Sequence, residues 1–266
     1  MKGAITGDII GSTYEWNRIK HKEFDLFPKG TDFTDDTVLT IALADAILNN
    51  LSYKESIHAY ARSFPERGYG GMFLSWIGED DPQPYNSFGN GSAMRVSAVG
   101  FAFNTEQEVL HHAAESARPS HNHPEGIKGA QAVALSIFLA RMGACRYEIK
   151  KIITDKFEYD LSGKLDEIRP GYDFNETCQG TVPAAITAFL ESICYEDAIR
   201  NAISLGGDSD TLACIAGGIA EAYYRGVPEE IEKKALSYLD SRLMKVVEMF
   251  YERFVNDGYS VKPCRE

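Results

Sequence analysis

The stretch that decides the fold is residues 34–49, TDDTVLTIALADAILN, where acidic and hydroxyl residues are followed by an apolar run. Val38, Leu39 and Ile41 begin a pattern with the three- and four-residue intervals of a helix. The first four residues, Thr34-Asp35-Asp36-Thr37, stand where such a helix would start. We therefore expect a helix that begins at this cluster and ends at Asn49-Asn50.

A second cluster of the same kind, Asp208-Ser209-Asp210-Thr211, precedes another apolar run. Each cluster places two carboxylates and a hydroxyl within one helical turn. Ligands that are all oxygen suit Mg²⁺ or Mn²⁺ better than zinc. Two such clusters that meet in the fold would hold two metal ions, an arrangement typical of hydrolases. The alternative is helix capping, because Asp and Thr are also favoured at helix N-termini. The spacing favours metal binding but leaves both interpretations open.

Helical spacing continues through most of the chain, whereas alternating strand patterns are nearly absent and no solenoid period repeats. Further helices are expected at residues 53–64, 106–117, 125–142, 147–157, 182–193, 196–205, 211–224, 229–239 and 242–254. The expected fold class is therefore all-α. Because no Pro/Gly/Ser-rich linker divides the chain, residues 1–266 are expected to form a single domain.

Small residues mark the first segment, where Gly3, Gly7 and Gly11 lie four positions apart. A glycine inside a helix costs about 1 kcal/mol relative to alanine, so three on one face call for an explanation. The pattern predicts close approach by a neighbouring helix or a ligand. The alternative, a loop over residues 3–12, is disfavoured by the apolar Ile5 and Ile9.

Composition limits the possible partners and the compartment. A formal net charge of −12 argues against nucleic acid or an anionic membrane as a partner, although it does not forbid a phosphate-bearing ligand. The N-terminus lacks the apolar region of a signal peptide, and no stretch has the length of a membrane span. The cysteines form no CxxC pair, so we expect buried free thiols in a reducing cytoplasm. These cysteines are Cys145, Cys178, Cys194, Cys214 and Cys264.

The expected loops carry most of the remaining chemistry. Residues 67–71 (RGYGG) and 87–92 (SFGNGS) combine glycines with an aromatic residue. Glycine lets backbone N–H groups approach an anion and the aromatic ring offers a stacking face, but both stretches are also common turns. In residues 120–124 (SHNHP) we favour a loop with one histidine facing a ligand over a His-x-His metal site. The other histidines, His21, His58, His111 and His112, have no recognisable setting and are interpreted as structural.

Several common catalytic motifs do not occur in the sequence. The G-x-S-x-G elbow, the P-loop, G-x-G-x-x-G and H-E-x-x-H are all missing, which removes the main support for four enzyme classes. Those classes are serine hydrolases, NTPases, dinucleotide oxidoreductases and zinc peptidases. Glu15 follows the small-residue segment directly. It is interpreted as a gate or an acid/base group, with an exposed glutamate at a helix end as the alternative.

Taken together, these motifs resemble the ADP-ribosylglycohydrolase family over nearly the whole chain and in the order found in that family. The combination of the two acidic clusters with the others is highly specific. The motifs are residues 7–15 (GDIIGSTYE), 34–37 (TDDT), 67–70 (RGYG), 89–95 (GNGSAMR), 120–121 (SH) and 206–211 (GGDSDT).

The resemblance implies a compact orthogonal bundle of helices with two Mg²⁺ ions at its centre; Mn²⁺ is the alternative. It also implies which residues form the site. The implied metal ligands are Thr34, Asp35, Asp36, Asp208, Asp210 and Thr211. The residues implied to cradle the diphosphate are Gly70, Gly71, Ser87, Asn90, Gly91 and Ser92, while Phe88 and His121 would line the ADP-ribose cleft.

Within the family, residues 11–15 (GSTYE) are similar to the branch that releases ADP-ribose from serine and related O-linked compounds. There the glutamate belongs to a mobile flap, but the segment from Glu15 to Thr34 is shorter here than in the animal members of that branch. The arginine-specific branch, with its nitrogenase-reactivating enzymes, shares the metal site, so the linkage stays open.

We expect a monomeric, Mg²⁺-dependent hydrolase that releases ADP-ribose from a modified protein or a small ADP-ribosyl compound. Asp35 would orient or deprotonate the attacking water, and Glu15 would assist the leaving group or close the site. The alternatives are an ADP-ribosyl-arginine hydrolase, a non-catalytic ADP-ribose-binding protein and an unrelated Mg²⁺-dependent phosphohydrolase.

Overall fold

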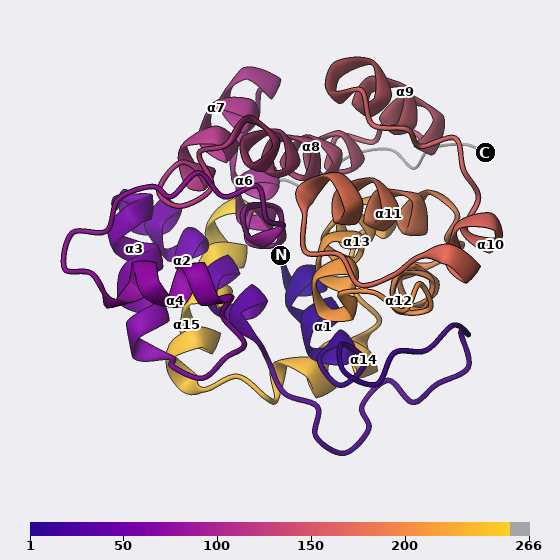
Figure 1. Cartoon of the computed structure of the whole chain (residues 1–266), viewed down its shortest axis with the longest axis horizontal. Coiled ribbons are helices and arrows are strands. Elements are labelled where there is room, and N and C mark those ends of the chain that lie inside the picture. The colour runs from indigo at the N-terminus through magenta and orange to yellow at the C-terminus, as the bar shows by residue number, and fades with distance from the viewer. Residues whose placement is uncertain (256–266) are drawn as a thin grey trace.

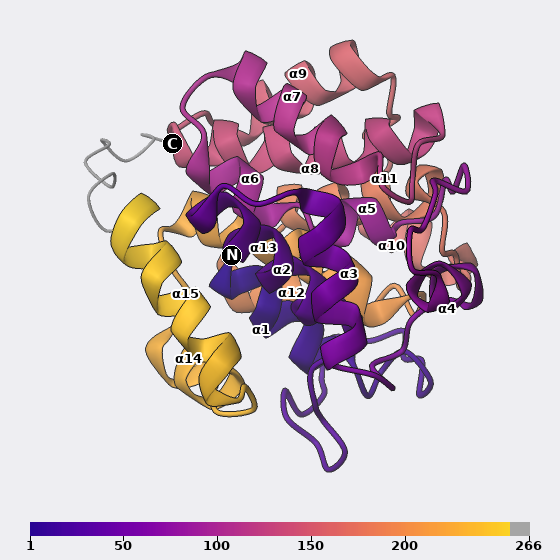
Figure 2. The same ribbon diagram turned by 90° about the vertical axis from the view of Figure 1, so that its left-hand side faces the viewer.

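Helices α1 (Lys2–Gly11) and α13 (Ser209–Tyr224) lie at the centre of the molecule. A computed structural model describes residues 1–255 of the chain. The other helices surround the central pair and run in several directions (Figures 1 and 2). Within residues 1–255 there is no β-strand, and the only bridge is an isolated antiparallel pair between Gly89 and Thr177. The expectation of an all-α fold is confirmed.

Most of the expected helices form, with ends that differ by a few residues. In addition, residues 165–171 hold two short helices that the spacing did not predict. The remaining elements are α2 (Asp35–Asn49), α3 (Tyr53–Ser63), α4 (Gly71–Gly78), α5 (Gly91–Met94), α6 (Ser97–Ala102), α7 (Glu106–Ala117), α8 (Pro124–Arg141), α9 (Arg146–Phe157), α10 (Leu165–Ile168), η1 (Arg169–Gly171), α11 (Cys178–Leu190), α12 (Tyr195–Ile203), α14 (Glu229–Leu236) and α15 (Ser241–Phe254).

The small-residue stripe of α1 packs directly on α13. A Cβ atom at Gly7 would lie 2.1 Å from the carbonyl oxygen of Ala213, and one at Gly3 would lie 2.4 Å from that of Gly217. A Cβ at Gly11 would lie 2.5 Å from the Cα of Asp210. Only glycine allows two helix backbones to approach so closely. The expected close approach is confirmed, and it fixes the start of α13 against the end of α1.

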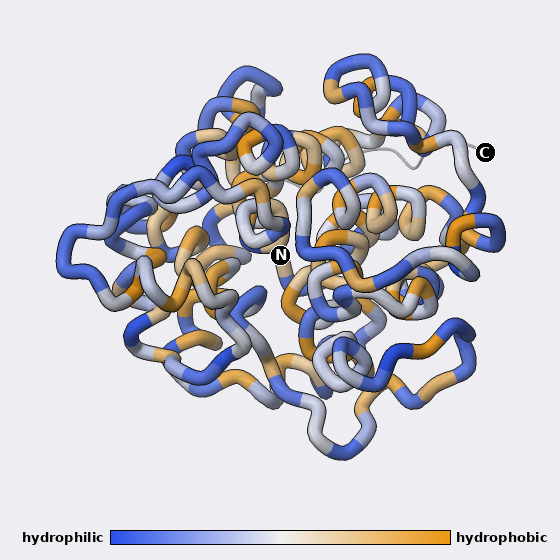
Figure 3. The backbone as a smooth tube through the Cα atoms, in the orientation of Figure 1, coloured by the Kyte–Doolittle hydropathy of each residue, from blue (hydrophilic) through white to orange (hydrophobic). Residues whose placement is uncertain are grey.

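The inner helices are apolar on all sides because neighbours surround them. Every residue of α13 from Ser209 to Ala222 is buried. Figure 3 shows the same contrast, with hydrophobic colour concentrated in the interior helices and hydrophilic colour along the outer turns of α7 and α9. Among residues 1–255, no helix combines the length and apolar character that crossing a membrane requires.

Two expectations about local structure need correction. The glycine-rich stretches at residues 67–71 and 87–92 were expected as loops, but α4 begins at Gly71 and α5 at Gly91. The four cysteines within the described residues are free, yet only Cys178 and Cys214 are buried, and Cys194 is exposed. Cys264 lies outside the described residues.

Candidate active site

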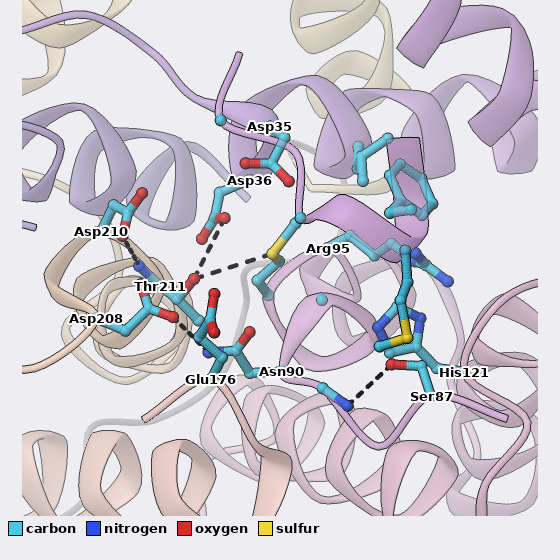
Figure 4. A pocket seen from close by; sticks show the side chains of 18 of the residues that line it. Asp35, Asp36, Ser87, Asn90, Arg95, His121, Glu176, Asp208, Asp210 and Thr211 are labelled. Atoms are coloured by element: carbon cyan, nitrogen blue, oxygen red, sulfur yellow. Dashed lines mark hydrogen bonds between the residues drawn. The ribbon is translucent and has the colours of Figure 1, made fainter. Parts of the chain in front are cut away.

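The N-terminal ends of α2 and α13 face each other at the centre of the molecule (Figure 4). Asp35 and Asp36 form the first turn of α2, and Asp208 and Asp210 flank the start of α13. The hydroxyl of Thr211 donates a hydrogen bond to Oδ1 of Asp36 at 3.3 Å. The structure therefore brings together the two acidic clusters that lie far apart in the sequence.

A third carboxylate, Asp8 of α1, holds the start of α2 in place. Its Oδ2 accepts hydrogen bonds from the backbone N–H of Thr34 at 3.0 Å and of Thr37 at 3.1 Å, and its Oδ1 accepts one from the hydroxyl of Thr34 at 2.7 Å. These are the free N–H groups that a helix N-terminus needs to satisfy. Asp8 thus orients Asp35 and Asp36, a role that its place in the sequence does not predict.

Glu15 joins the cluster from the segment after α1. One carboxylate oxygen each of Glu15, Asp208 and Asp210 lie within 4.8 Å of one another. The segment beyond Glu15 is tied to the rest of the protein by Lys20, whose Nζ donates to the carbonyl oxygens of Arg169 at 2.9 Å and Leu205 at 2.6 Å. Glu15 is therefore half-buried beside the acidic cluster and is not an exposed helix-end glutamate.

Burial and mutual repulsion raise the pKa values of these carboxyl groups. Burial, followed by the charge of Asp210, raises the pKa of Glu15 to about 8. The same two causes raise the pKa values of Asp35 and Asp36 well above the ordinary range. Burial, and then the charge of Asp208, does the same for Asp210. Repulsion between carboxylates packed this closely is relieved either by protons or by a bound cation.

The residues present fit a hard divalent cation. Oδ2 of Asp36 is buried and has no hydrogen-bond partner within residues 1–255, which leaves it free to bind an ion. The surrounding donors are carboxylate and hydroxyl oxygens, the ligands preferred by Mg²⁺ and Mn²⁺. The hydroxyl of Thr34 also caps α2, since it accepts a hydrogen bond from the N–H of Asp36 at 3.3 Å. Thr34 is therefore the cap of α2, and its role as a metal ligand stays a prediction.

A cleft of about 410 Å³ opens above the acidic cluster. This volume is in the range of sites that bind small molecules. Its lining joins the carboxylates to the glycine-rich segments and to one histidine. The lining residues are Glu15, Asp35, Asp36, Leu39, Gly68, Gly70, Gly71, Met72, Phe73, Tyr85, Ser87, Gly89, Asn90, Gly91, Met94, Arg95, His121, Glu176, Asp208, Asp210 and Thr211.

The loop before α5 is hydrogen-bonded to both the acidic cluster and a distant segment. Nδ2 of Asn90 donates to Oδ2 of Asp208 at 2.7 Å. The N–H of Asn90 donates to the carbonyl oxygen of Glu176 at 2.7 Å, and the N–H of Cys178 donates to that of Phe88 at 2.9 Å. These bonds bring Glu176 into the cleft, a position that no motif in its surroundings predicts.

Two expected binding residues lie outside the lining of the cleft. The ring of Phe88 is 46% exposed and packs against His123, with 5.3 Å between ring centroids. The hydroxyl of Ser92 donates to the carbonyl oxygen of Gly126 at 2.7 Å in the buried core. The binding roles expected for Phe88 and Ser92 stay predictions, which the lining of the cleft does not support.

The two histidines of residues 121–123 have different surroundings. His121 is buried and lines the cleft. His123 is the N-cap of α8, where its Nδ1 accepts a hydrogen bond from the N–H of Glu125 at 3.1 Å. His58 and His112 pack against Trp76 and Phe103.

Comparisons with known proteins point to one family. The profile of the family described as ADP-ribosylglycohydrolase matches residues 1–259. The human protein named ADP-ribosylhydrolase ARH3 is 27% identical, over 92% of this chain and 90% of its own length. The ADP-ribosylarginine hydrolase Tri1 of Pseudomonas putida is 25% identical, over 95% of this chain and 77% of its own.

A solved structure described as an ADP-ribosylglycohydrolase-related protein complex shares the fold. Its TM-score is 0.67 at 22% identity, and the match covers 94% of this chain and 96% of that one. The fold, the acidic cleft and the profile match lead to the same conclusion: this chain belongs to the ADP-ribosylglycohydrolase family.

Proposed function

We propose that this ADP-ribosylglycohydrolase cleaves the bond between ADP-ribose and an O-linked acceptor such as serine, in a reaction that depends on Mg²⁺. The observation that carries the proposal is the arrangement of the cleft. Acidic residues from α2 and α13 lie at one end, and the glycine-rich loop before α5 lies beside them. Oxygen ligands for a cation are thus placed next to backbone groups suited to a diphosphate.

Two metal ions would be held by Thr34, Asp35, Asp36, Asp208, Asp210 and Thr211, with Mn²⁺ as the alternative to Mg²⁺. A bound divalent ion lowers the pKa of a coordinated water and fixes the hydroxyl groups of a sugar. Gly70, Gly71, Ser87, Asn90 and Gly91, which all line the cleft, would contact the diphosphate.

The side chains of the cluster would move the protons of the reaction. Asp35 accepts a proton from the water that attacks the anomeric carbon of the ribose. The bond between that carbon and the acceptor oxygen breaks, and Glu15 gives a proton to the departing oxygen. The approach of Glu15 to Asp208 and Asp210 supports this role, because its carboxyl group lies beside the carboxylates that would hold the metal ions.

The preference for an O-linked acceptor rests on the similarity of residues 11–15 to the branch that acts on serine. The likeness to an ADP-ribosylarginine hydrolase supports the alternative, an arginine-linked acceptor. A non-catalytic ADP-ribose-binding protein is disfavoured, since every acidic residue of the two clusters lines the cleft. We further propose a cytoplasmic monomer whose partners are ADP-ribosylated proteins or small molecules, not nucleic acids.

The test is release of ADP-ribose from matched serine-linked and arginine-linked ADP-ribosyl peptides, in Mg²⁺ and in EDTA. We expect release from the serine peptide in Mg²⁺ only. Asp210→Asn should abolish it, whereas Asp80→Asn, at a fully exposed carboxylate, should not. Release from the arginine peptide alone would overturn the choice of linkage. Full activity in EDTA would overturn the metal dependence.

A further inference from the structure

Arg95 is the largest fully buried side chain in the described part of the molecule, and it lies against the cleft. Its Nη2 donates to the carbonyl oxygen of Ser116 at 2.9 Å and to the hydroxyl of Ser120 at 3.0 Å. Nε and Nη1 have no hydrogen-bond partner within residues 1–255. Figure 4 shows Arg95 beside His121, at the opposite end of the cleft from the aspartates. A cation buried at this place is not explained by the metal site.

The hydroxyl of Ser120 connects Arg95 to His121. Ser120 is fully buried, and its Oγ lies 2.8 Å from Nδ1 of His121. A guanidinium group can only donate hydrogen bonds, so Ser120 must accept from Arg95. Within the described residues, Nδ1 of His121 is the only partner left for the hydroxyl proton. If Nδ1 carried a proton instead, a buried O–H group would have no acceptor, which is strongly unfavourable.

The direction of this chain of hydrogen bonds determines the state of the imidazole ring. Because Nδ1 accepts, the proton of the neutral ring resides on Nε2. Nε2 has no hydrogen-bond partner in the described part of the chain, and it lies against the glycine loop. A Cβ atom at Gly91 would come within 3.0 Å of Nε2, and one at Gly89 within 3.5 Å. Burial, and then the positive charge of Arg95, holds the pKa of His121 well below its usual value.

We propose that Arg95 and Ser120 are positioning residues that fix His121 as the neutral tautomer with its proton on Nε2. In this state Nε2 donates a hydrogen bond to a phosphate oxygen of the bound diphosphate. A phosphate is favoured over a ribose hydroxyl because the charge of Arg95 and the backbone N–H groups of the glycine loop favour an anion at this end of the cleft. The inference rests on the proposed function and deepens it.

The tautomer is read directly by a two-bond ¹⁵N–¹H correlation spectrum of the unliganded protein at pH 7, with His121→Gln used for assignment. We expect His121 to show an unprotonated Nδ1 and a protonated Nε2. A protonated Nδ1, or a doubly protonated ring, would overturn the proposal. This measurement needs neither a ligand nor a folded Ser120 variant, so it decides the tautomer whatever the activity of the protein.

The positioning role is tested with Ser120→Ala against the matched control Ser136→Ala. Ser136 is also fully buried, and its hydroxyl donates within α8 to the carbonyl oxygen of Ala132 at 2.8 Å. In Mg²⁺ buffer we expect Ser120→Ala to mix the two tautomers and to weaken ADP-ribose binding by about 5- to 10-fold, with no change in Ser136→Ala. Equal affinities in the two variants would overturn the role of Ser120. No binding of ADP-ribose by the unsubstituted protein would overturn the proposed function and the phosphate acceptor, while the spectrum would still decide the tautomer.

Discussion

Glu15 contributes to the acidic cluster from outside the two helices that define it. Its carboxylate lies within 4.8 Å of those of Asp208 and Asp210, on the segment that follows α1. A group that acts on the leaving oxygen contributes to the transition state more than to the bound substrate. We therefore expect Glu15→Gln to lower kcat by about 100-fold and to change the Kd for ADP-ribose by less than about 3-fold.

Steady-state kinetics and calorimetric binding check this prediction, with Glu23→Gln as the control. Glu23 is an exposed glutamate on the same segment, so its substitution makes the same change of carboxyl to amide without touching the cluster. An unchanged kcat in Glu15→Gln would contradict a chemical role for Glu15. A large loss of binding with an unchanged kcat would identify Glu15 as a binding residue.

Cleft residues that occur in clusters could be predicted from the sequence, whereas those that stand alone could not. Two matched acidic groups predicted Asp35, Asp36, Asp208 and Asp210 as neighbours, and the structure places them around one cleft. Arg95, in contrast, ends the motif of residues 89–95, but nothing in its sequence surroundings predicts full burial. Its position depends on hydrogen bonds to Ser116 and Ser120, which are tertiary contacts.

Among the helices, the packing of α1 on α13 determines the geometry of the acidic cluster. A Cβ at Gly7 would lie 2.1 Å from the carbonyl oxygen of Ala213, which is on the same helix as Asp210. The backbone cannot yield as a flexible side chain would, so Gly7→Ala must push the two helices apart. We expect a loss of about 2 to 4 kcal/mol of stability, seen as a lower midpoint in urea unfolding, together with loss of activity.

Gly218→Ala is the matched control on α13. A Cβ at Gly218 would make ordinary contacts of 3.4 to 3.5 Å with Ile137, Ala4 and Ser97. Alanine is the better helix former by about 1 kcal/mol, so this variant should be as stable as the parent or more so. If Gly7→Ala unfolded at the same urea concentration as Gly218→Ala, the close contact between α1 and α13 would be refuted.

Whole helices were easier to predict from the sequence than short ones. Long periodic runs such as residues 106–117 correspond to helices with the expected ends. Short helices were missed where glycine begins them, as in α4 and α5. Helix α11 begins at Cys178, before its expected start at residue 182, because the hydroxyl of Thr177 caps it by accepting from the N–H of Gly180 at 3.1 Å.

In the molecule as a whole, the acidic cluster lies where segments from both ends of the chain meet. Asp8 and Asp35 come from the first two helices, and Asp210 from the thirteenth. A cation bound here would therefore connect α2 and α13. The resemblance to a known family implies such a shared metal site, whereas the spacing of the two clusters alone leaves it open. The expectation that residues 1–266 form a single domain stays a prediction.

A divalent cation bound at the acidic cluster should stabilise the folded protein, because it offsets the repulsion between the buried carboxylates. The protein carries a formal net charge of −12, and burial with mutual repulsion raises the pKa values of Asp35, Asp36 and Asp210. Mg²⁺ at 100 times its Kd stabilises a folded protein by about 2.7 kcal/mol. For a chain of this size we expect the Tm to rise by about 5 to 10 °C relative to EDTA.

Differential scanning calorimetry measures this shift, and two controls separate specific binding from screening. NaCl at matched ionic strength screens mainly the exposed charges and should raise the Tm far less than Mg²⁺ does. Asp210→Asn removes one carboxylate of the cluster, so its Tm should respond weakly to Mg²⁺ and should exceed that of the parent in EDTA, where repulsion is unrelieved. If Mg²⁺ raised the Tm of the variant and of the parent by the same amount, the stabilising ion would bind elsewhere on the acidic surface. The ion would then not connect α2 to α13.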